Sequence, residues 1–323
     1  MLAGRGLLLV ALLGCRAAPG EPGAWTKRNS SEINLTTIAW SGSQLVAIGC
    51  CSVLTSPDGL KWTRAVQEAG YGPPAAGSMP YQWQLESVVW GGSQFVAVGK
   101  VVGQAEPLQW DRALIATSPD GVTWREQSVP DSGGKLLDVA WSGRRFVAVG
   151  SVVLTSTDGL TWSAVRTPMP FNDNWPADAV TWGGSQFVVL GGKAAMTSRD
   201  GVKWIERSAI HASEDIAWSG DRFVAVGNDL PLTSPDGVTW SSHPSPLGAY
   251  GWRAVTWGDS QFVAVGSAGI MTSPDGMNWT DQVAPVGTYA DVVWSGTRFV
   301  AVGEFRRKGW FADYTVGLIV SSP

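Results

Sequence analysis

The sequence predicts an all-β protein, a seven-bladed β-propeller with four antiparallel strands per blade. The ring would be closed by the N-terminal strand, which pairs with the C-terminal blade. Three observations predict this fold. The 323 residues include 40 Gly and 19 Pro without a long helical pattern, 19 Trp stand beside only 5 Tyr, and two short Trp-containing segments recur along the chain. A helical bundle, a nucleotide-binding α/β enzyme and a disordered chain are excluded.

The first recurring segment is a strand that ends in Trp, a Ser-Gly or Gly-Gly turn, and a strand such as Phe-Val-Ala-Val-Gly. Its tryptophans follow one another at 36 to 51 residues, which is near the length of a propeller blade. We call them the first-half tryptophans: Trp40, Trp90, Trp141, Trp182, Trp218, Trp257 and Trp294.

The second recurring segment is a short strand, an Asp-Gly turn and a strand that carries the second-half tryptophan. These residues are Trp62, Trp124, Trp162, Trp204, Trp240 and Trp279. The two segments make two hairpins, and a four-stranded sheet that is apolar on both faces must stack against neighbouring sheets around an axis. We expect both sets of tryptophans to be buried in the core.

The chain ends predict how the ring closes. The seventh copy stops at residues 320–323, before its Asp-Gly turn, and the missing strand stands at residues 23–26 with Trp25. Pairing the two ends removes unpaired strand edges. The expected blade units are 29–66, 80–128, 131–167, 172–208, 209–243, 248–283, and 285–323 completed by 23–28, all within a propeller domain of residues 23–323.

The first residues resemble an export signal. Arg5 precedes an apolar run at residues 7–13, which is too short to span a bilayer. The run ends at Gly14-Cys15, and the segment is similar to the lipobox of bacterial lipoproteins. The resemblance implies a signal peptide at 1–14, lipidation of Cys15 and a tether at 15–22. Lipoproteins retained in the inner membrane carry Asp after the lipidated cysteine; because Arg16 stands there in this chain, the resemblance favours anchoring in the outer membrane. An ordinary signal with an incidental cysteine is the alternative.

The Ser-x-Asp-Gly-x-x-Trp copies resemble the Asp-box (BNR-type repeat) of sialidase-like propellers, with one residue fewer between Asp and Gly. The resemblance implies a structural role for Asp58, Asp120, Asp158, Asp200, Asp236 and Asp275. Calcium binding at these aspartates is the alternative, but each turn offers a single carboxylate. We expect no metal site and no cofactor.

Strand direction alternates, so the links between blades and the connections between second and third strands share one side, which we call the loop face. The Ser-Gly and Asp-Gly turns share the opposite side, the turn face. Aromatic and polar residues outside the repeats map to the loop face and form the candidate ligand-binding surface: Tyr71, Tyr81, Trp83, Trp110, Arg112, Trp175, Tyr250, Trp252, Arg253, Trp310 and Tyr314. Such residues suit a carbohydrate or protein ligand. Packing of the inserted loops onto the ring is the alternative.

Two smaller features remain. Acidic residues near the start of the innermost strands predict an acidic mouth of the axial channel, interrupted by Arg253: Glu86, Asp138, Asp178, Glu214, Asp215 and Asp291. Adjacent Cys50 and Cys51 could form a vicinal disulfide, remain free or pair between molecules.

A net charge of −4 gives no footprint for nucleic acid. From the export signal and the loop-face residues together, we expect a monomeric, lipid-anchored propeller of the cell envelope that binds a carbohydrate or protein ligand and is not an enzyme. A sialidase-like glycoside hydrolase is the enzymatic alternative, for which no catalytic residues can be assigned. A factor that assists assembly of an envelope or membrane complex is a second alternative, because photosystem assembly propellers carry similar repeats.

Overall fold

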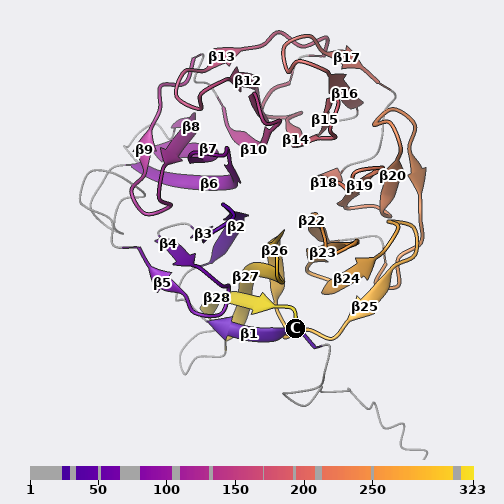
Figure 1. The fold of residues 1–323 in the computed structure, drawn as a ribbon. Coiled ribbons are helices and arrows are strands. Elements are labelled where there is room, and N and C mark those ends of the chain that lie inside the picture. The colour runs from indigo at the N-terminus through magenta and orange to yellow at the C-terminus, as the bar shows by residue number, and fades with distance from the viewer. Residues whose placement is uncertain are drawn as a thin grey trace, which may run out of the picture.

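Seven sheets surround a central axis in the computed structural model (Figure 1), which confirms the predicted seven-bladed propeller. The structure describes residues 24–29, 34–49, 52–65, 81–103, 110–130, 134–169, 171–191, 194–207, 213–248, 251–307 and 314–323. Each sheet has four antiparallel strands. In six blades the strands follow one another in chain order from the axis outward, and in the last blade the outermost strand comes from the N-terminal end of the chain.

The strands of the first four blades, from the axis outward, are as follows. Blade 1 has β2 (Leu35–Trp40), β3 (Leu45–Gly49), β4 (Ser52–Ser56) and β5 (Thr63–Arg64); blade 2 has β6 (Tyr81–Trp90), β7 (Phe95–Gly103), β8 (Trp110–Ser118) and β9 (Arg125–Glu126); blade 3 has β10 (Leu136–Trp141), β11 (Phe146–Gly150), β12 (Val153–Ser156) and β13 (Ser163–Ala164); blade 4 has β14 (Ala177–Trp182), β15 (Phe187–Gly191), β16 (Ala194–Ser198) and β17 (Ile205–Glu206).

The remaining blades follow the same order. Blade 5 has β18 (Ser213–Trp218), β19 (Phe223–Gly227), β20 (Leu232–Ser234) and β21 (Ser241–Ser242); blade 6 has β22 (Trp252–Gly258), β23 (Gln261–Gly266), β24 (Ile270–Ser273) and β25 (Thr280–Gln282); blade 7 has β26 (Thr288–Trp294), β27 (Phe299–Arg307), β28 (Tyr314–Ser321) and β1 (Thr26–Asn29).

The ring closes where the two ends of the chain pair. Thr26 lies opposite Ser321 and Lys27 opposite Val320 in the antiparallel pair of β1 and β28, as the sequence predicted. Trp25 is 6% exposed and packs in the same core cluster as Tyr289 and Phe299. It therefore takes the place of the second-half tryptophan that blade 7 lacks.

Every innermost strand contains a β-bulge near its loop-face end. In blade 2, for example, the register shifts between Leu85 and Ser87, so that Glu86 has no partner on β7. The bulged backbone lies against the glycine that ends the second strand, and a Cβ at Gly99 would overlap the carbonyl oxygen of Gln84. The final Gly of the Phe-Val-Ala-Val-Gly segment is therefore required by close packing within the blade.

The two sets of tryptophans differ in burial, which corrects the expectation that both are core. Trp25 and four of the six second-half tryptophans are buried, namely Trp124, Trp162, Trp204 and Trp279, whereas Trp62 and Trp240 are half-buried. All seven first-half tryptophans are only half-buried. They stand at the turn-face ends of the innermost strands. In blades 2 to 7 each packs on the Phe opposite it in the second strand, with ring centroids 4.1 to 4.7 Å apart.

Candidate functional site

The Asp-Gly turns on the turn face are closed by hydrogen bonds within each turn. Asp158 Oδ1 accepts from the backbone N–H groups of Leu160 and Thr161, both at 2.8 Å, and from the Ser156 hydroxyl. Gly159 adopts a φ of 72°, and its carbonyl accepts the indole N–H of Trp162 at 2.9 Å. The carboxylate thus supplies the acceptor that the tight turn needs.

The same Asp interactions recur in all six copies, and they fix the charge of the six aspartates. Backbone N–H donors lower the pKa of Asp58, Asp158, Asp200 and Asp236 below the ordinary carboxyl value. At Asp120 and Asp275 burial acts in the raising direction, but the donors outweigh it and the pKa is again lowered.

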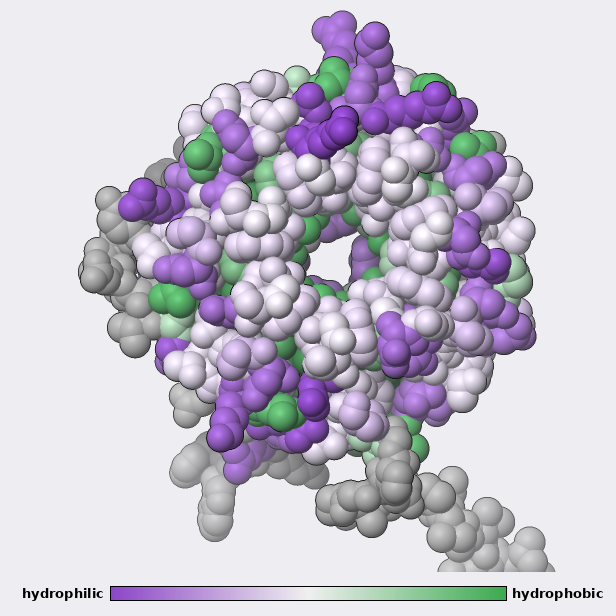
Figure 2. Space-filling view, in the orientation of Figure 1, coloured by the Kyte–Doolittle hydropathy of each residue, from purple (hydrophilic) through white to green (hydrophobic). Residues whose placement is uncertain are grey.

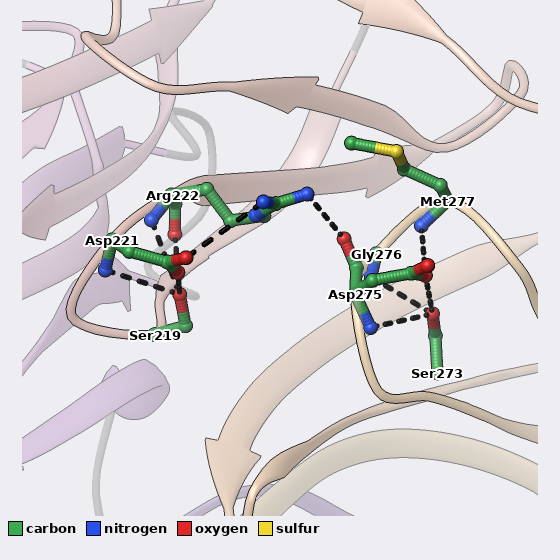
Figure 3. A network of polar contacts seen from close by, with 7 residues as sticks. All are labelled: Ser219, Asp221, Arg222, Ser273, Asp275, Gly276 and Met277. Carbon is green, nitrogen blue, oxygen red and sulfur yellow. Dashed lines mark hydrogen bonds and ion pairs between the residues drawn. The ribbon is translucent and has the colours of Figure 1, made fainter.

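Long side chains link neighbouring blades across the turn face. Gln44, Gln94 and Gln186 donate from their amides to the carbonyl oxygens of Asp120, Asp158 and Asp236 in the next blade, at 2.7 to 3.0 Å. Arg222 makes the equivalent contact with the Asp275 carbonyl at 3.0 Å (Figure 3). Four of the six Asp-Gly turns are therefore held by a side chain of the neighbouring blade.

The loop face departs from the repeat in two blades. The strands β6, β7 and β8 have 10, 9 and 9 residues, and β27 and β28 have 9 and 8, whereas β10 and β11 have 6 and 5. About four extra residues raise a hairpin by roughly 13 Å. Because blades 2 and 7 are the two neighbours of blade 1 in the ring, the raised hairpins stand on either side of it.

The structure places the predicted loop-face residues in different environments. Trp83 is 6% exposed and lies in a core cluster with Trp124, and Trp252 is fully buried, with its indole N–H donated to the Gly248 carbonyl. Neither can offer a ring face to a ligand, so for these two the packing alternative applies. Arg112, another residue of the predicted ligand-binding surface, forms an ion pair with Glu126 at 2.5 Å.

Two predicted residues do face solvent. Trp175 is 53% exposed in the link from blade 3 to blade 4, where Asn172 Oδ1 accepts the backbone N–H groups of Asn174 and Trp175. Arg253 is exposed at the bulge of β22. Cys15, Cys50, Cys51, Tyr71, Tyr250 and Trp310, and the side chains of Tyr81, Trp110 and Tyr314, lie outside the described residues.

Five of the six acidic residues predicted at the channel fall into two groups, where the sequence suggested one ring, and the sixth, Asp178, is half-buried at the bulge of β14. Glu86 and Glu214 are exposed at bulge positions, whereas Asp138, Asp215 and Asp291 occupy the position after the bulge in blades 3, 5 and 7. Each of these three carboxylates bonds to the next blade, accepting the backbone N–H of Val180, Val255 or Ile38 at 2.7 to 2.8 Å.

The three aspartates lie on the innermost strands β10, β18 and β26, which surround the channel whose opening Figure 2 shows at the centre of the ring. Burial raises the pKa of the Asp138 and Asp215 carboxyls, and it raises the pKa of Asp291 to about 6. Repulsion between the carboxylates adds to the shift at Asp215 and Asp291. Because their hydrogen-bond partners lie in the next blade, these aspartates connect neighbouring blades. Composition alone did not indicate this role.

Within the described part of the chain, no three His, Cys, Asp or Glu side chains gather closely enough to hold a metal ion. The same residues contain no helix with the length and apolar character needed to cross a membrane.

Comparisons with known proteins show similarity of fold at low sequence identity. No protein-family model and no curated protein matches the chain. Among solved structures, a chain of the mitotic checkpoint complex has a TM-score of 0.60 at 10% identity, covering 98% of both chains. The WD40 domain of Pan2 from Neurospora crassa has a TM-score of 0.57 at 11% identity, covering 93% of this chain and 95% of that one. A gluconolactonase from Xanthomonas campestris has a TM-score of 0.52 at 11% identity, covering 95% and 96%.

Proposed function

We propose that this chain is a lipid-anchored docking module of the bacterial cell envelope, and that it binds a protein partner through its loop face. The observation that carries the proposal is the contrast between the two faces. The turn face repeats one Asp-Gly turn six times, with four of these turns bonded to the neighbouring blade, whereas the loop face carries two raised hairpins around blade 1 and the exposed side chains of Trp175 and Arg253. A non-repetitive surface can distinguish one partner from others.

The direction of β1 supports the orientation of such a module. Thr26 begins β1 opposite Ser321, at the turn-face end of β28. The ten residues from Arg16 to Trp25 follow Cys15, and a fully extended chain of this length spans at most about 35 Å. A lipid on Cys15 would hold the turn face toward the membrane and leave the loop face directed away from it.

Site-specific photo-crosslinking in the envelope tests the proposal. A crosslinking amino acid at Arg253 or Thr315 on the loop face is expected to give one discrete adduct. The same amino acid at Ser43 or Thr239, exposed on the turn face, is the matched control and is expected to give no such adduct. Adducts from the turn face alone would overturn the assignment of the binding face.

The anchor is tested separately by metabolic labelling with a clickable palmitate. Label is expected on the wild-type chain and not on Cys15→Ser. Label that persists in Cys15→Ser would contradict the anchor without affecting the crosslinking result.

A further inference from the structure

A groove lies between blades 4 and 5 on the turn face, away from the surface assigned to docking. Its volume is about 600 Å³. Blade 4 contributes two turns, and blade 5 contributes its first-half tryptophan and its Asp-Gly turn. The lining residues are Gly183, Ser185, Gln186, Arg199, Trp218, Phe223, Pro235, Asp236 and Val238. The groove is large enough for one or two sugar rings.

The lining of the groove includes one half-buried aromatic side chain, Trp218. Trp218 packs against Phe223 with ring centroids 4.3 Å apart, and this contact holds the indole in place. Gly183 lies so close to the Phe223 ring that a Cβ there would overlap it, and a Cβ at Gly184 would stand 3.7 Å from the indole nitrogen. Gly183 is therefore required by the Phe223 ring, and at position 184 no side chain stands against the indole nitrogen.

The walls carry both a cation and an anion. Arg199 is exposed, and none of the ion pairs among the described residues includes it. Asp236 uses Oδ1 to hold its own turn, accepting from Val238 and Thr239, and backbone donors keep its pKa low, so it stays charged. A guanidinium donor and a carboxylate acceptor in one groove disfavour a ligand with a net charge of either sign.

Arg199 is specific to this junction. The equivalent position of the Asp-Gly turn is Pro57, Pro119, Pro235 or Pro274 in four of the other copies and Thr157 in the fifth. The turn itself does not need an arginine, because the same hydrogen bonds close the turns that carry proline. The side chain at position 199 is therefore available for another purpose.

We propose that this groove binds a neutral pyranose unit of a glycan. The flat apolar face of the sugar would stack on Trp218, ring hydroxyls would accept from Arg199, and others would donate to Asp236. Trp218 with Pro235 and Val238 supplies the apolar contact, and the mixed charges supply the orienting polar groups. This site is on the opposite face from the proposed protein-docking surface and does not depend on it.

Saturation-transfer NMR of the full chain with cellobiose and maltose tests the proposal, with glucuronate and glucosamine as charged counterparts. Binding of a neutral disaccharide in the millimolar range is expected, weaker for the charged sugars. The indole N–H resonance that is missing from Trp218→Phe is expected to shift on binding. No saturation transfer from the neutral sugars, or stronger binding of a charged one, would overturn the proposal.

Arg199→Pro separates binding from folding, because proline is already present at this position in four turns. The variant is expected to keep its melting temperature and to bind the disaccharide about tenfold more weakly. Pro57→Arg places the same side chain on the blade 1 turn and is the matched control, with unchanged affinity expected. Equal affinity of Arg199→Pro and wild type would contradict the assigned site.

Discussion

Asp291 in the last blade accepts the backbone N–H of Ile38 in the first blade at 2.8 Å. The same carboxylate accepts the Thr37 hydroxyl at 3.0 Å and the N–H of Val292 in its own strand. The ring is therefore closed twice, at its rim by the pairing of β1 with β28 and at the channel by Asp291. Asp138 and Asp215 make the same kind of link between blades 3 and 4 and between blades 5 and 6.

Asp291→Ala is expected to destabilise the protein by about 3 kcal/mol, because three donors lose their acceptor. Asp291→Asn retains one carbonyl oxygen and should lie between Asp291→Ala and wild type. Urea unfolding followed by circular dichroism measures both changes. A stability of Asp291→Ala equal to that of wild type would show that the channel link does not contribute to closure.

The raised pKa values of the channel aspartates predict that stability falls as the pH rises from about 4 to about 6. Burial raises the pKa of Asp291 to about 6 from 3.8, so the folded protein keeps a proton that the unfolded chain has lost. That contribution is complete below pH 3.8 and is lost as the pH rises through 6. Urea midpoints measured from pH 4 to 7 are expected to fall.

Asp291→Asn is the control for this pH dependence. His243, whose pKa is lowered by burial, acts with the opposite sign in an overlapping range, so the comparison between variant and wild type isolates the aspartate. The slope between pH 4 and 6 should be smaller in Asp291→Asn. The same slope in both proteins would contradict the predicted titration.

The fold could be predicted from the sequence because the repeat is regular where it determines structure. Each copy that combines a Trp, a turn glycine and a Phe-Val-Ala-Val-Gly strand predicts one hairpin. The incomplete seventh copy predicts the strand that closes the ring. The candidate site was less accessible to such reasoning. Trp83 lies near the start of β6 and Trp252 begins β22, in segments that differ little from exposed links in composition, and only tertiary packing shows that they are buried.

Interactions between blades were also beyond sequence reasoning. Asp215 and Glu214 are adjacent acidic residues, yet the bulge directs Asp215 to Val255 in the next blade and leaves Glu214 exposed. The proposed binding in the groove beside Trp218 requires Arg199. In the sequence this residue is visible only as a replacement for the proline of four other copies. Comparing the six Asp-Gly turns position by position could have identified that residue.

Asp158→Ala is expected to lower stability by about 1 kcal/mol, because Leu160 and Thr161 lose the side-chain acceptor that caps their N–H groups. Asp158→Asn, which keeps an oxygen acceptor, should lose less. Because each turn offers one carboxylate, calcium and chelator should leave the melting temperature of wild type unchanged. A rise in melting temperature with calcium that Asp158→Ala reduces would instead support metal binding at these turns.

Ser260→Gly is expected to stabilise the protein by about 1 kcal/mol. In the turn between β22 and β23, Asp259 and Ser260 adopt φ values of 44° and 58°, a conformation that costs a residue with a side chain about 1–2 kcal/mol. Ser43→Gly is the matched control, because Ser43 holds the equivalent place in blade 1 without a positive φ and should gain nothing. Equal shifts in melting temperature for both variants would show that the backbone conformation is not the cause.

Trp25→Ala is expected to lower stability by about 3–5 kcal/mol, because it leaves a cavity beside Tyr289 and Phe299 and loosens the strand that closes the ring. The backbone bond from Trp25 N–H to the Val283 carbonyl also depends on that strand staying in place. Trp175→Ala, at a position that is 53% exposed, is the control of equal size and should change the melting temperature far less. Similar losses in the two variants would mean that closure by the N-terminal strand adds little, and that the other blade contacts hold the seventh blade in the ring.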